Sequence, residues 1–370
     1  MTLPPVWKVK RELYRIRDQA ARASSNVYEL PLRYLHNRWL NKAACPLSGS
    51  LVLGSKVAVL VLYQPNGIAR STLLTCDHLI AQGYSPFILS NAPVSASDRA
   101  ELLARSALLL ERPNFGYDFG AYQDGVRLLA KLGHNPDRLI LMNDSTWFPL
   151  RADDTSIARM EASGDAFTGK VYKSEPKIGL GRDHMESHFL MFNRNAQQSR
   201  AFKDFWYRYP MTSSRFNTIQ RGEKGISSAM FDAGFASQGL TSKNILLARL
   251  ADEPFAALKK VLHEASFDPN KLQQKTQTLL TAATDTSEWR QEVLDHVRDV
   301  IQMPATTLSV TFIYFTMTKL GLGFVKKAQD DFFHLTRIKV LELEAAGEIE
   351  ALNLDVRAEM SASVANWTRG

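Results

Sequence analysis

The chain has 370 residues, of which 45% are hydrophobic, so it can bury a large core and is not an intrinsically disordered protein. Its net charge of +7 is concentrated at one end. The first 50 residues carry nine Lys or Arg against three Asp or Glu, which leaves a net charge of +1 for the other 320. No nucleic-acid-binding motif accompanies the basic residues, so we expect no nucleic-acid partner.

Residues 1–50 are predicted to form a basic amphipathic N-terminal arm. Aromatic side chains such as Trp7, Tyr14, Tyr34 and Trp39 are interleaved with its cations. This pattern is typical of a helix on an anionic membrane surface, and also of a basic helix packed on the main domain. The arm lacks the apolar run of a signal peptide, and two cysteines without metal spacing suit a reducing compartment. We therefore expect a cytoplasmic protein.

Residues 51–245 show the pattern of an α/β domain. The unbroken apolar run at 57–63 predicts a strand that is buried on both faces of a sheet. Further strands are expected at 86–90, 107–111 and 139–142, and helices at 71–82, 98–105 and 118–132. Strands that alternate with helices predict βαβ crossovers and a mostly parallel central sheet.

The pattern changes after residue 144. A short strand is expected at 165–169, a polar loop at 173–184, a strand at 187–193, and helices at 202–209 and 222–234. Residues 246–370 are predicted to form a helical C-terminal region. Within it, the stretch 306–325 approaches membrane-spanning length, but it contains Lys319, two glycines and six Ser or Thr, which favours a buried helix.

The segment from Arg112 to Tyr122 is a candidate anion-binding turn. It offers the cation of Arg112, the amide of Asn114, a permissive Gly116, Tyr117, and Asp118 at the expected start of a helix. Glycine allows the backbone to approach a ligand closely, and the N–H groups at a helix N-terminus favour phosphate. We expect these residues to contact a nucleotide, with Asp118 also capping the helix.

Asn143, Asp144 and Ser145 stand where the strand at 139–142 stops. Ligands of α/β sheets bind at the carboxyl ends of strands, so Asp144 is the best candidate for a metal or ribose contact. The alternative is an ordinary turn or capping aspartate. We expect the three residues to bind the ligand, and Asp144 to hold Mg²⁺ or Mn²⁺.

Two further groups could act on a second substrate. His184, Glu186 and His188 alternate along an expected strand and would line an acceptor cleft, with a soft-metal site as the weaker alternative. Glu223 precedes the helix expected at 222–234. It could be a general base that takes a proton from an acceptor hydroxyl, or a first-turn glutamate stabilised by the helix dipole.

Together, four blocks of sequence resemble the rhamnan synthesis protein F family of bacterial polysaccharide glycosyltransferases, which are related to GT-A enzymes. These blocks run from Asn114 to Gly120, through Asn143-Asp144-Ser145, from His184 to Trp206, and from Gly222 to Gly234. The segment from Gly321 to Lys327 is similar to a further family pattern, without its proline.

The resemblance implies a GT-A-like domain that binds a nucleoside-diphosphate sugar, possessing a metal site at Asp144 and a base at Glu223. Only one carboxylate stands where relatives carry Asp-X-Asp, and Glu186-Ser187-His188 replaces an expected Gln-Ser-Tyr. The implied function is inverting transfer of a sugar to a cell-surface polysaccharide or a lipid-linked glycan. The family implies that this sugar is rhamnose or another deoxyhexose. It would act peripherally on the inner face of the bacterial plasma membrane. The alternative is a non-catalytic glycan-binding or scaffold protein.

Overall fold

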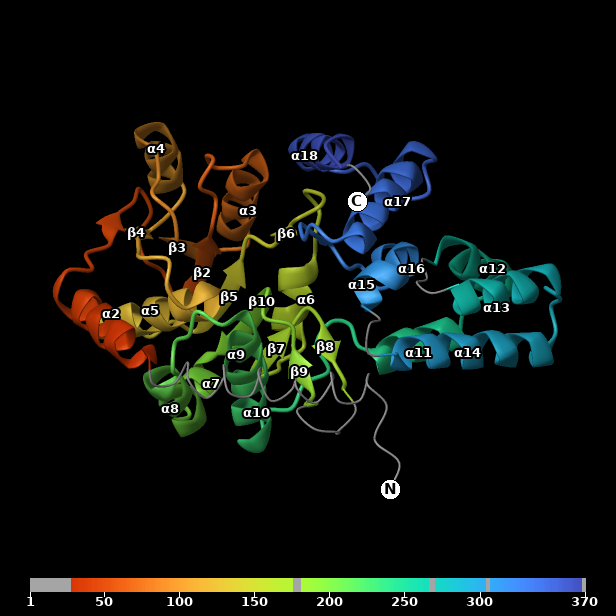
Figure 1. Cartoon of the computed structure of the whole chain (residues 1–370), viewed down its shortest axis with the longest axis horizontal. Helices are drawn as coiled ribbons and strands as arrows, with labels where there is room; N and C mark the ends of the chain where they lie inside the picture. Colours follow the sequence, from red (N-terminus) through yellow and green to blue (C-terminus); the bar gives the residue numbers. More distant parts are fainter. Residues whose placement is uncertain (1–27, 176–180, 266–269, 304–306, 368–370) are drawn as a thin grey trace, which may run out of the picture.

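The computed structural model describes residues 28–175, 181–265, 270–303 and 307–367, and its centre is a seven-stranded sheet (Figure 1). The strand order is β1-β4-β3-β2-β5-β10-β7. The strands are β1 (Leu47–Ser48), β2 (Lys56–Leu62), β3 (Ser85–Ser90), β4 (Leu108–Glu111), β5 (Arg138–Asn143), β7 (Phe167–Gly169) and β10 (Phe189–Asn193). Strands β4, β3, β2 and β5 are parallel, and the flanking strands β1, β10 and β7 pair antiparallel. The predicted α/β class with its parallel centre is confirmed.

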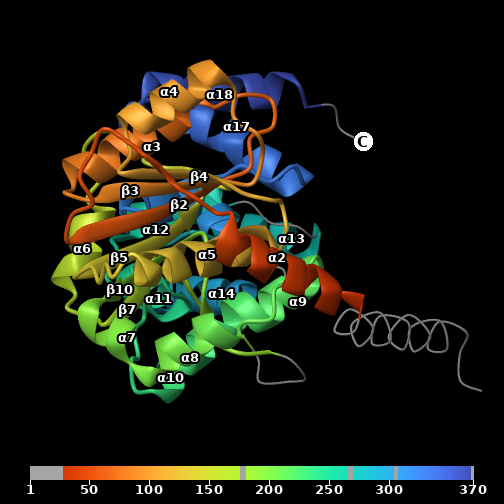
Figure 2. The same cartoon turned by 90° about the vertical axis from the view of Figure 1, so that its left-hand side faces the viewer.

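Helices cover both faces of this sheet, as Figure 2 shows. On one face lie α3 (Arg70–Ala81), α4 (Ala96–Ala104) and α6 (Ser156–Ala162); on the other lie α5 (Tyr117–Lys131), α8 (Arg200–Arg208) and α10 (Lys224–Asp232). Alternate residues of β2 serve the two cores: Val57, Val59 and Val61 join one, and Ala58, Leu60 and Leu62 the other. Burial on both faces explains why the strand reads as one apolar run.

The expected elements of residues 51–245 are found within a few residues of their predicted positions. The polar loop expected at 173–184 is instead flanked by two short paired strands, β8 (Tyr172–Lys173) and β9 (His184–Met185), with 176–180 outside the described residues. Asp118 does not cap α5: the N-cap is Gly116 at a φ of +86°, and the Asp118 carboxylate accepts from the adjacent Phe119 N–H. The small helix α7 (Arg194–Gln198) links β10 to α8.

The part of the N-terminal arm that the structure describes is packed on the main domain. Helix α2 (Leu30–Lys42) lies beside α5 (Figure 2), where His36 Nε2 is 2.8 Å from Asp124 Oδ2. Glu29 is buried and accepts from Ser213 N–H at 2.7 Å, while Arg33 Nε donates to the Met211 carbonyl at 2.6 Å. The predicted membrane role of residues 1–27 lies outside the described residues.

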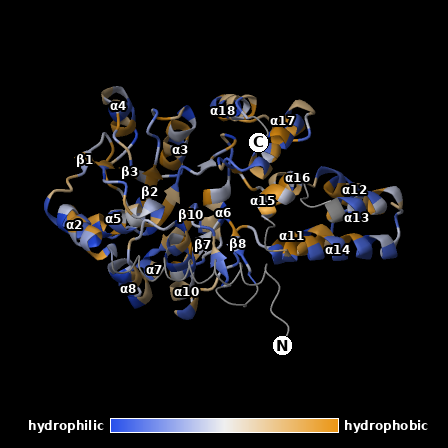
Figure 3. Cartoon of the chain, viewed as in Figure 1, coloured by the Kyte–Doolittle hydropathy of each residue, from blue (hydrophilic) through white to orange (hydrophobic). Residues whose placement is uncertain are grey.

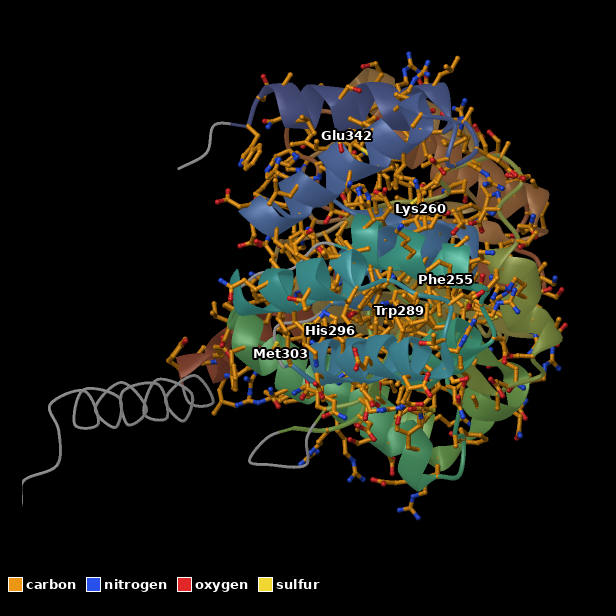
Figure 4. All side chains as sticks on the ribbon, turned by 90° about the vertical axis from the view of Figure 1, so that its right-hand side faces the viewer. Phe255, Lys260, Trp289, His296, Met303 and Glu342 are labelled. Carbon is orange, nitrogen blue, oxygen red and sulfur yellow. The ribbon has the colours of Figure 1, made fainter. Side chains whose placement is uncertain are left out.

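A separate helical layer follows the α/β domain. It contains α11 (Lys243–Ala251), α12 (Phe255–Glu264), α13 (Asn270–Thr281) and α14 (Ser287–Gln302), with a hydrophobic core of its own. Phe255 and Trp289 meet in this core with ring centroids 4.9 Å apart (Figure 4). On the edge of the layer, Lys260 is paired with Glu348 at 2.8 Å.

The C-terminal region is mainly helical, with one two-residue strand. The apolar stretch around 306–325 forms two short helices, α15 (Leu308–Thr311) and α16 (Ile313–Thr318), which are coloured mainly hydrophobic in Figure 3. It then forms β11 (Val325–Lys326), which pairs antiparallel with β6 (Thr146–Trp147). Helices α17 (Asp331–Ala345) and α18 (Leu354–Ala365) are the last two helices of the described residues. In the part of the chain that is described, no helix has the length and apolarity needed to cross a membrane.

Candidate functional site

A pocket of about 700 Å³, here called the central pocket, opens at the carboxyl edge of the parallel strands. The residues that follow β2, β3 and β5 all reach it, because parallel strands end at the same edge of a sheet. Ten of the predicted site residues line it: Asn114, Tyr117, Asp118, Asn143, Asp144, Ser145, His184, Glu186, His188 and Glu223. Residues that are far apart in sequence therefore share one cavity.

Asp144 joins the ends of two neighbouring strands. Its Oδ2 accepts from the Tyr63 N–H and from Gln64 Nε2, each at 2.9 Å, and its own N–H donates to the Val61 carbonyl. These contacts position the carboxylate beside the loop that follows β2. Asp144 is thus held in place by backbone groups and by the Gln64 side chain, and it lines the pocket at the point where the two strands end.

Asn143 connects Asp144 to the helix that begins after the Gly116 turn. Its Nδ2 donates to Asp118 Oδ2 at 2.9 Å, and its Oδ1 accepts from the Ser145 N–H at 3.1 Å. Burial, followed by the nearby charge of Glu223, raises the pKa of Asp118 to about 6. The pocket therefore contains a carboxyl group that titrates close to neutral pH.

Glu223 also lines the pocket, and its charge acts on the nearby Asp118. Burial raises the pKa of Glu223, but the hydrogen bonds from His184 and from the Ser187 N–H outweigh burial and lower it to about 2. The Ser187 N–H is 2.7 Å from Glu223 Oε2, and His184 Nε2 is 3.3 Å from Oε1. Glu223 is therefore an ionised carboxylate in a fixed orientation, with a neighbouring imidazole whose own pKa is raised in spite of burial.

The helix that carries Glu223 has an irregular turn. The sequence suggested that Glu223 comes before a helix, but it is the last residue of a π-helical turn, η1 (Thr218–Glu223), which continues into α10 without a break. The short helix α9 (Arg215–Asn217) precedes it. Single π-helical turns occur frequently at functional sites. Gly222 allows this turn to approach the Phe119 ring, since a Cβ there would lie 2.5 Å from Phe119 Cγ.

Glu186 and the two histidines form the floor of the pocket, but not as one strand. His184 is the first residue of β9, Glu186 follows that strand, and Ser187 and His188 form a turn before β10. Glu186 accepts from Lys326 Nζ at 2.7 Å and lies 3.5 Å from His188 Nδ1. Burial lowers the pKa of His188 to about 3, so this imidazole is neutral. All three side chains are largely buried, which suits positioning of a ligand at the base of the cavity.

Arg112 and Gly116 were expected to contact the ligand, but neither lines the pocket. The Arg112 guanidinium is buried and donates to Asp124 Oδ2 at 2.8 Å, Asn91 Oδ1 at 2.6 Å and the Phe115 carbonyl at 2.8 Å. It therefore holds the turn in shape from behind. Gly116 supplies the left-handed backbone that the turn requires. Both residues support the pocket wall rather than form it.

Several lining residues were missed by sequence reasoning. Lys173 and Arg215 bring positive charge to the pocket. Lys326 comes from β11, more than 180 residues after β5, through the pairing of β11 with β6. The similarity of segment 321–327 to a family pattern was the only sequence signal for it. A lone surface cation has no local signature that marks it as part of a site.

A divalent cation fits this pocket only as an ion shared with a ligand. Among the described residues, no group of three or more His, Cys, Asp or Glu side chains could form a complete metal cage. Asp144 offers one carboxylate, and its Oδ2 already accepts two hydrogen bonds. Mg²⁺ is commonly held by one or two carboxylates together with substrate phosphates and water. Asp144 with a bound diphosphate would meet that requirement.

These features define an α/β protein whose sheet is covered by helices on both faces, with a polar ligand pocket at the carboxyl edge of that sheet. A family model described as rhamnan synthesis protein F matches residues 87–302. The chain belongs to this family, as the sequence blocks predicted. The match includes most of the residues that line the pocket.

A curated relative is the uncharacterized protein y4gN of Sinorhizobium fredii (strain NBRC 101917 / NGR234), with 29% identity over 255 residues. The alignment covers 69% of this chain and 66% of that protein, so the chain spans just under two thirds of the relative's length.

Two solved structures show a distant likeness. The glycosyltransferase GlyE of Streptococcus pneumoniae TIGR4 has 9% identity and a TM-score of 0.30, covering 74% of this chain and 66% of its own. The mannosyltransferase PcManGT of Pyrobaculum calidifontis, in complex with GDP-Man and Mn²⁺, has 10% identity and a TM-score of 0.30, covering 90% and 96%. At these TM-scores, neither likeness supports a conclusion about the site.

Replacing Gly222 with alanine is expected to distort the pocket. The new Cβ would overlap the Phe119 ring, which packs against Trp206 and Tyr209 and has little room to move. Overpacking of this kind costs about 1–3 kcal/mol. We expect a lower melting temperature for Gly222→Ala. Gly225→Ala is the matched control in the same helix, with its nearest contact at 3.2 Å. Equal stability of the two variants would contradict the close packing of η1 on Phe119.

Replacing Asp118 with asparagine tests the raised pKa. In the unfolded chain this carboxyl ionises near 3.8, whereas the folded protein keeps the proton until about pH 6. The folded state therefore binds more protons between these values, and wild-type stability falls as pH rises through them. Between pH 4 and pH 6, the free energy of unfolding of Asp118→Asn should rise relative to that of the wild type by up to about 3 kcal/mol. Melting curves recorded across this range measure the difference. A difference between the two that is independent of pH would show that the pKa of Asp118 is ordinary.

Proposed function

We propose that this protein is an inverting glycosyltransferase whose nucleoside-diphosphate-sugar donor binds in the central pocket. Membership of the rhamnan synthesis protein F family supports transfer of a sugar. The observation that carries the proposal is the meeting of Asp118, Asp144 and Glu223 in one polar cavity at the carboxyl edge of the parallel strands. This edge is where α/β proteins bind nucleotides. The proposed sugar, rhamnose or another deoxyhexose, rests on the family alone.

The donor would extend from the turn before α5 toward Glu223. Asn91, Asn114 and Tyr117 offer amide and aromatic groups to the nucleoside, and Asp144 lies where the diphosphate would pass. Lys173 and Arg215 would attract the negatively charged donor into the pocket. A Mg²⁺ or Mn²⁺ ion at Asp144 would supply charge neutralisation to the departing diphosphate. The sugar ring would then lie beside Glu223 and the residues of the pocket floor.

In the transfer step, an acceptor hydroxyl oxygen would form a bond to the anomeric carbon as the bond from that carbon to the diphosphate breaks. Attack from the side opposite the leaving group inverts the configuration. We propose Glu223 as the base, because it is ionised and fixed by His184 and Ser187. A base works best with a pKa near the working pH, so Asp118 is the second candidate for this role. His184, Glu186 and His188 would orient the acceptor end.

The first experiment is a thermal shift assay with nucleoside diphosphates and their sugars, with and without Mn²⁺. One nucleotide family should raise the melting temperature of the wild type by a few degrees, since a ligand at 100 times its Kd stabilises by about 2.7 kcal/mol. Asp144→Asn should lose the Mn²⁺-dependent part of this shift. Asp153→Ala, which removes an exposed carboxylate outside the pocket, is the control. No shift with any nucleotide would overturn the donor site and favour the non-catalytic alternative.

The same assay separates binding from catalysis. Glu223→Gln should keep the nucleotide shift and lose transfer by about 10²–10⁴-fold, the usual effect of removing a general base. If Glu223→Gln transfers sugar normally while Asp118→Asn does not, the base is Asp118.

We also propose that helix α2 contacts an anionic membrane surface beside a lipid-linked acceptor. Apolar side chains at its start are strongly exposed, among them Tyr34 at 66% and Leu35 at 58%, and the chain before it is rich in cations. An exposed apolar cluster next to basic residues is typical of interfacial helices.

Vesicle co-sedimentation measures this contact. Wild-type protein should sediment with vesicles of phosphatidylglycerol and phosphatidylcholine, and much less with phosphatidylcholine alone. The double variant Tyr34→Glu, Leu35→Glu should bind about tenfold more weakly, because two apolar side chains no longer enter the interface. Tyr207→Glu, at an exposed aromatic position on α8, is the control. Equal sedimentation of the double variant and the control would exclude α2 as the membrane contact.

A further inference from the structure

A second cavity, of about 890 Å³, lies next to the central pocket and shares Tyr63 and Asp144 with it. One wall is the loop at 63–69, which follows β2. The opposite wall is formed by α17, α18 and the residues that follow α18, and Trp147 and Lys327 lie between the two walls. We call this cavity the C-terminal pocket.

The walls of the C-terminal pocket are fixed by buried polar contacts. Glu359 of α18 accepts from the Ser71 N–H at 2.8 Å and from Trp147 Nε1 at 2.9 Å. Arg337 of α17 is fully buried, donates to Ser363 Oγ at 2.8 Å, and lies 5.2 Å from the Trp147 ring. These contacts tie α17 and α18 to α3 and β6. The cavity is therefore a formed site and not a gap between loosely packed segments.

The lining of this pocket suits a sugar better than a nucleotide. Tyr63 and Trp367 offer aromatic surface, and Asn66, Gln329 and Asn366 offer amides that both donate and accept hydrogen bonds. Aromatic faces with a few well-placed polar groups are the usual lining of a small-molecule site, and they match the apolar faces and hydroxyl edges of a sugar ring.

The charges of the lining are compatible with a neutral sugar. Asp144 and Glu359 bring two carboxylates, whereas Lys327 brings one ammonium, whose pKa burial lowers. The pKa of His334 is also lowered, so this imidazole adds no charge at neutral pH. The lining therefore has no excess of positive charge, and it can accept an uncharged ligand rich in hydroxyl groups.

The two pockets meet at a shared edge. Tyr63 and Asp144 line both cavities. The neighbouring residues Lys326 and Lys327 line one pocket each, because successive residues of an extended segment point to opposite sides. A ligand in the C-terminal pocket could therefore reach past Tyr63 and Asp144 to the proposed reaction centre.

We propose that the C-terminal pocket is the acceptor subsite. It binds the neutral sugar residues of the growing glycan that precede the terminal residue, to which the new sugar is added. The proposal rests on the proposed function, because it assigns the donor to the central pocket. It gives α17 and α18 a role in recognition of the glycan chain. It also places the acceptor's distal residues outside the floor formed by His184, Glu186 and His188.

The test is a filling variant on the exposed side of α18. Ala362 lines the C-terminal pocket and is exposed, so Ala362→Trp narrows the cavity without entering the core. Ala365→Trp is the matched control: it is exposed on the same helix and does not line the pocket. Binding of a rhamnan tetrasaccharide is measured by isothermal titration calorimetry on the full chain. Nucleoside diphosphate binding is measured in parallel by thermal shift.

We expect Ala362→Trp to weaken tetrasaccharide binding at least tenfold and to leave the nucleotide shift unchanged, while Ala365→Trp changes neither. Unchanged tetrasaccharide binding in Ala362→Trp, or no binding to the wild type, overturns the subsite. Loss of the nucleotide shift in Ala362→Trp would make this cavity the nucleotide site instead. If the wild type binds the tetrasaccharide but no nucleotide, the C-terminal pocket is a glycan-binding site, whereas the proposed transferase function and the acceptor role fail.

Discussion

The parallel pairing of β2 with β5 is the constraint on which the whole site depends. It places Val61 opposite Asn143, so both strands end at one level and the loop after β2 begins beside Asp144. The Tyr63 N–H and the Asp144 carboxylate then meet at 2.9 Å. Burial of both strands on two faces stabilises this register, because a shift by one residue would exchange the two cores. The carboxylate is therefore positioned by the hydrophobic core.

The remainder of the site is built from irregular structure added to this edge. Gly116 provides a left-handed turn before α5, and Gly222 permits a π-helical turn to pack on Phe119. Buried Arg112 holds the first turn by its contacts with Asp124 and the Phe115 carbonyl. Glycine and buried charge are costly in regular structure, so their use here indicates that geometry at the pocket is favoured over stability.

Much of this arrangement could be predicted from sequence, and the exceptions have physical reasons. Apolar runs and helical periodicity located β2 and α5, and the stop after β5 located Asp144, since these signals are local. Arg112 was misplaced because a cation beside a glycine turn looks the same whether it contacts a ligand or a buried carboxylate. Lys326 was missed because its position depends on a pairing between β6 and β11 that are distant in sequence. Long-range pairing leaves no periodic signal in a single chain.

The attachment of α2 bears on how this chain can be shortened. Glu29 and Arg33 hold the backbone at Met211 and Ser213, immediately before the helix that carries Glu223. A protein trimmed to begin at residue 50 would keep every residue of both pockets, yet it would lose the support of that segment. Proteolysis or truncation within the N-terminal arm would therefore alter the pocket wall that carries Glu223. Helix α2 is therefore a structural part of the α/β domain.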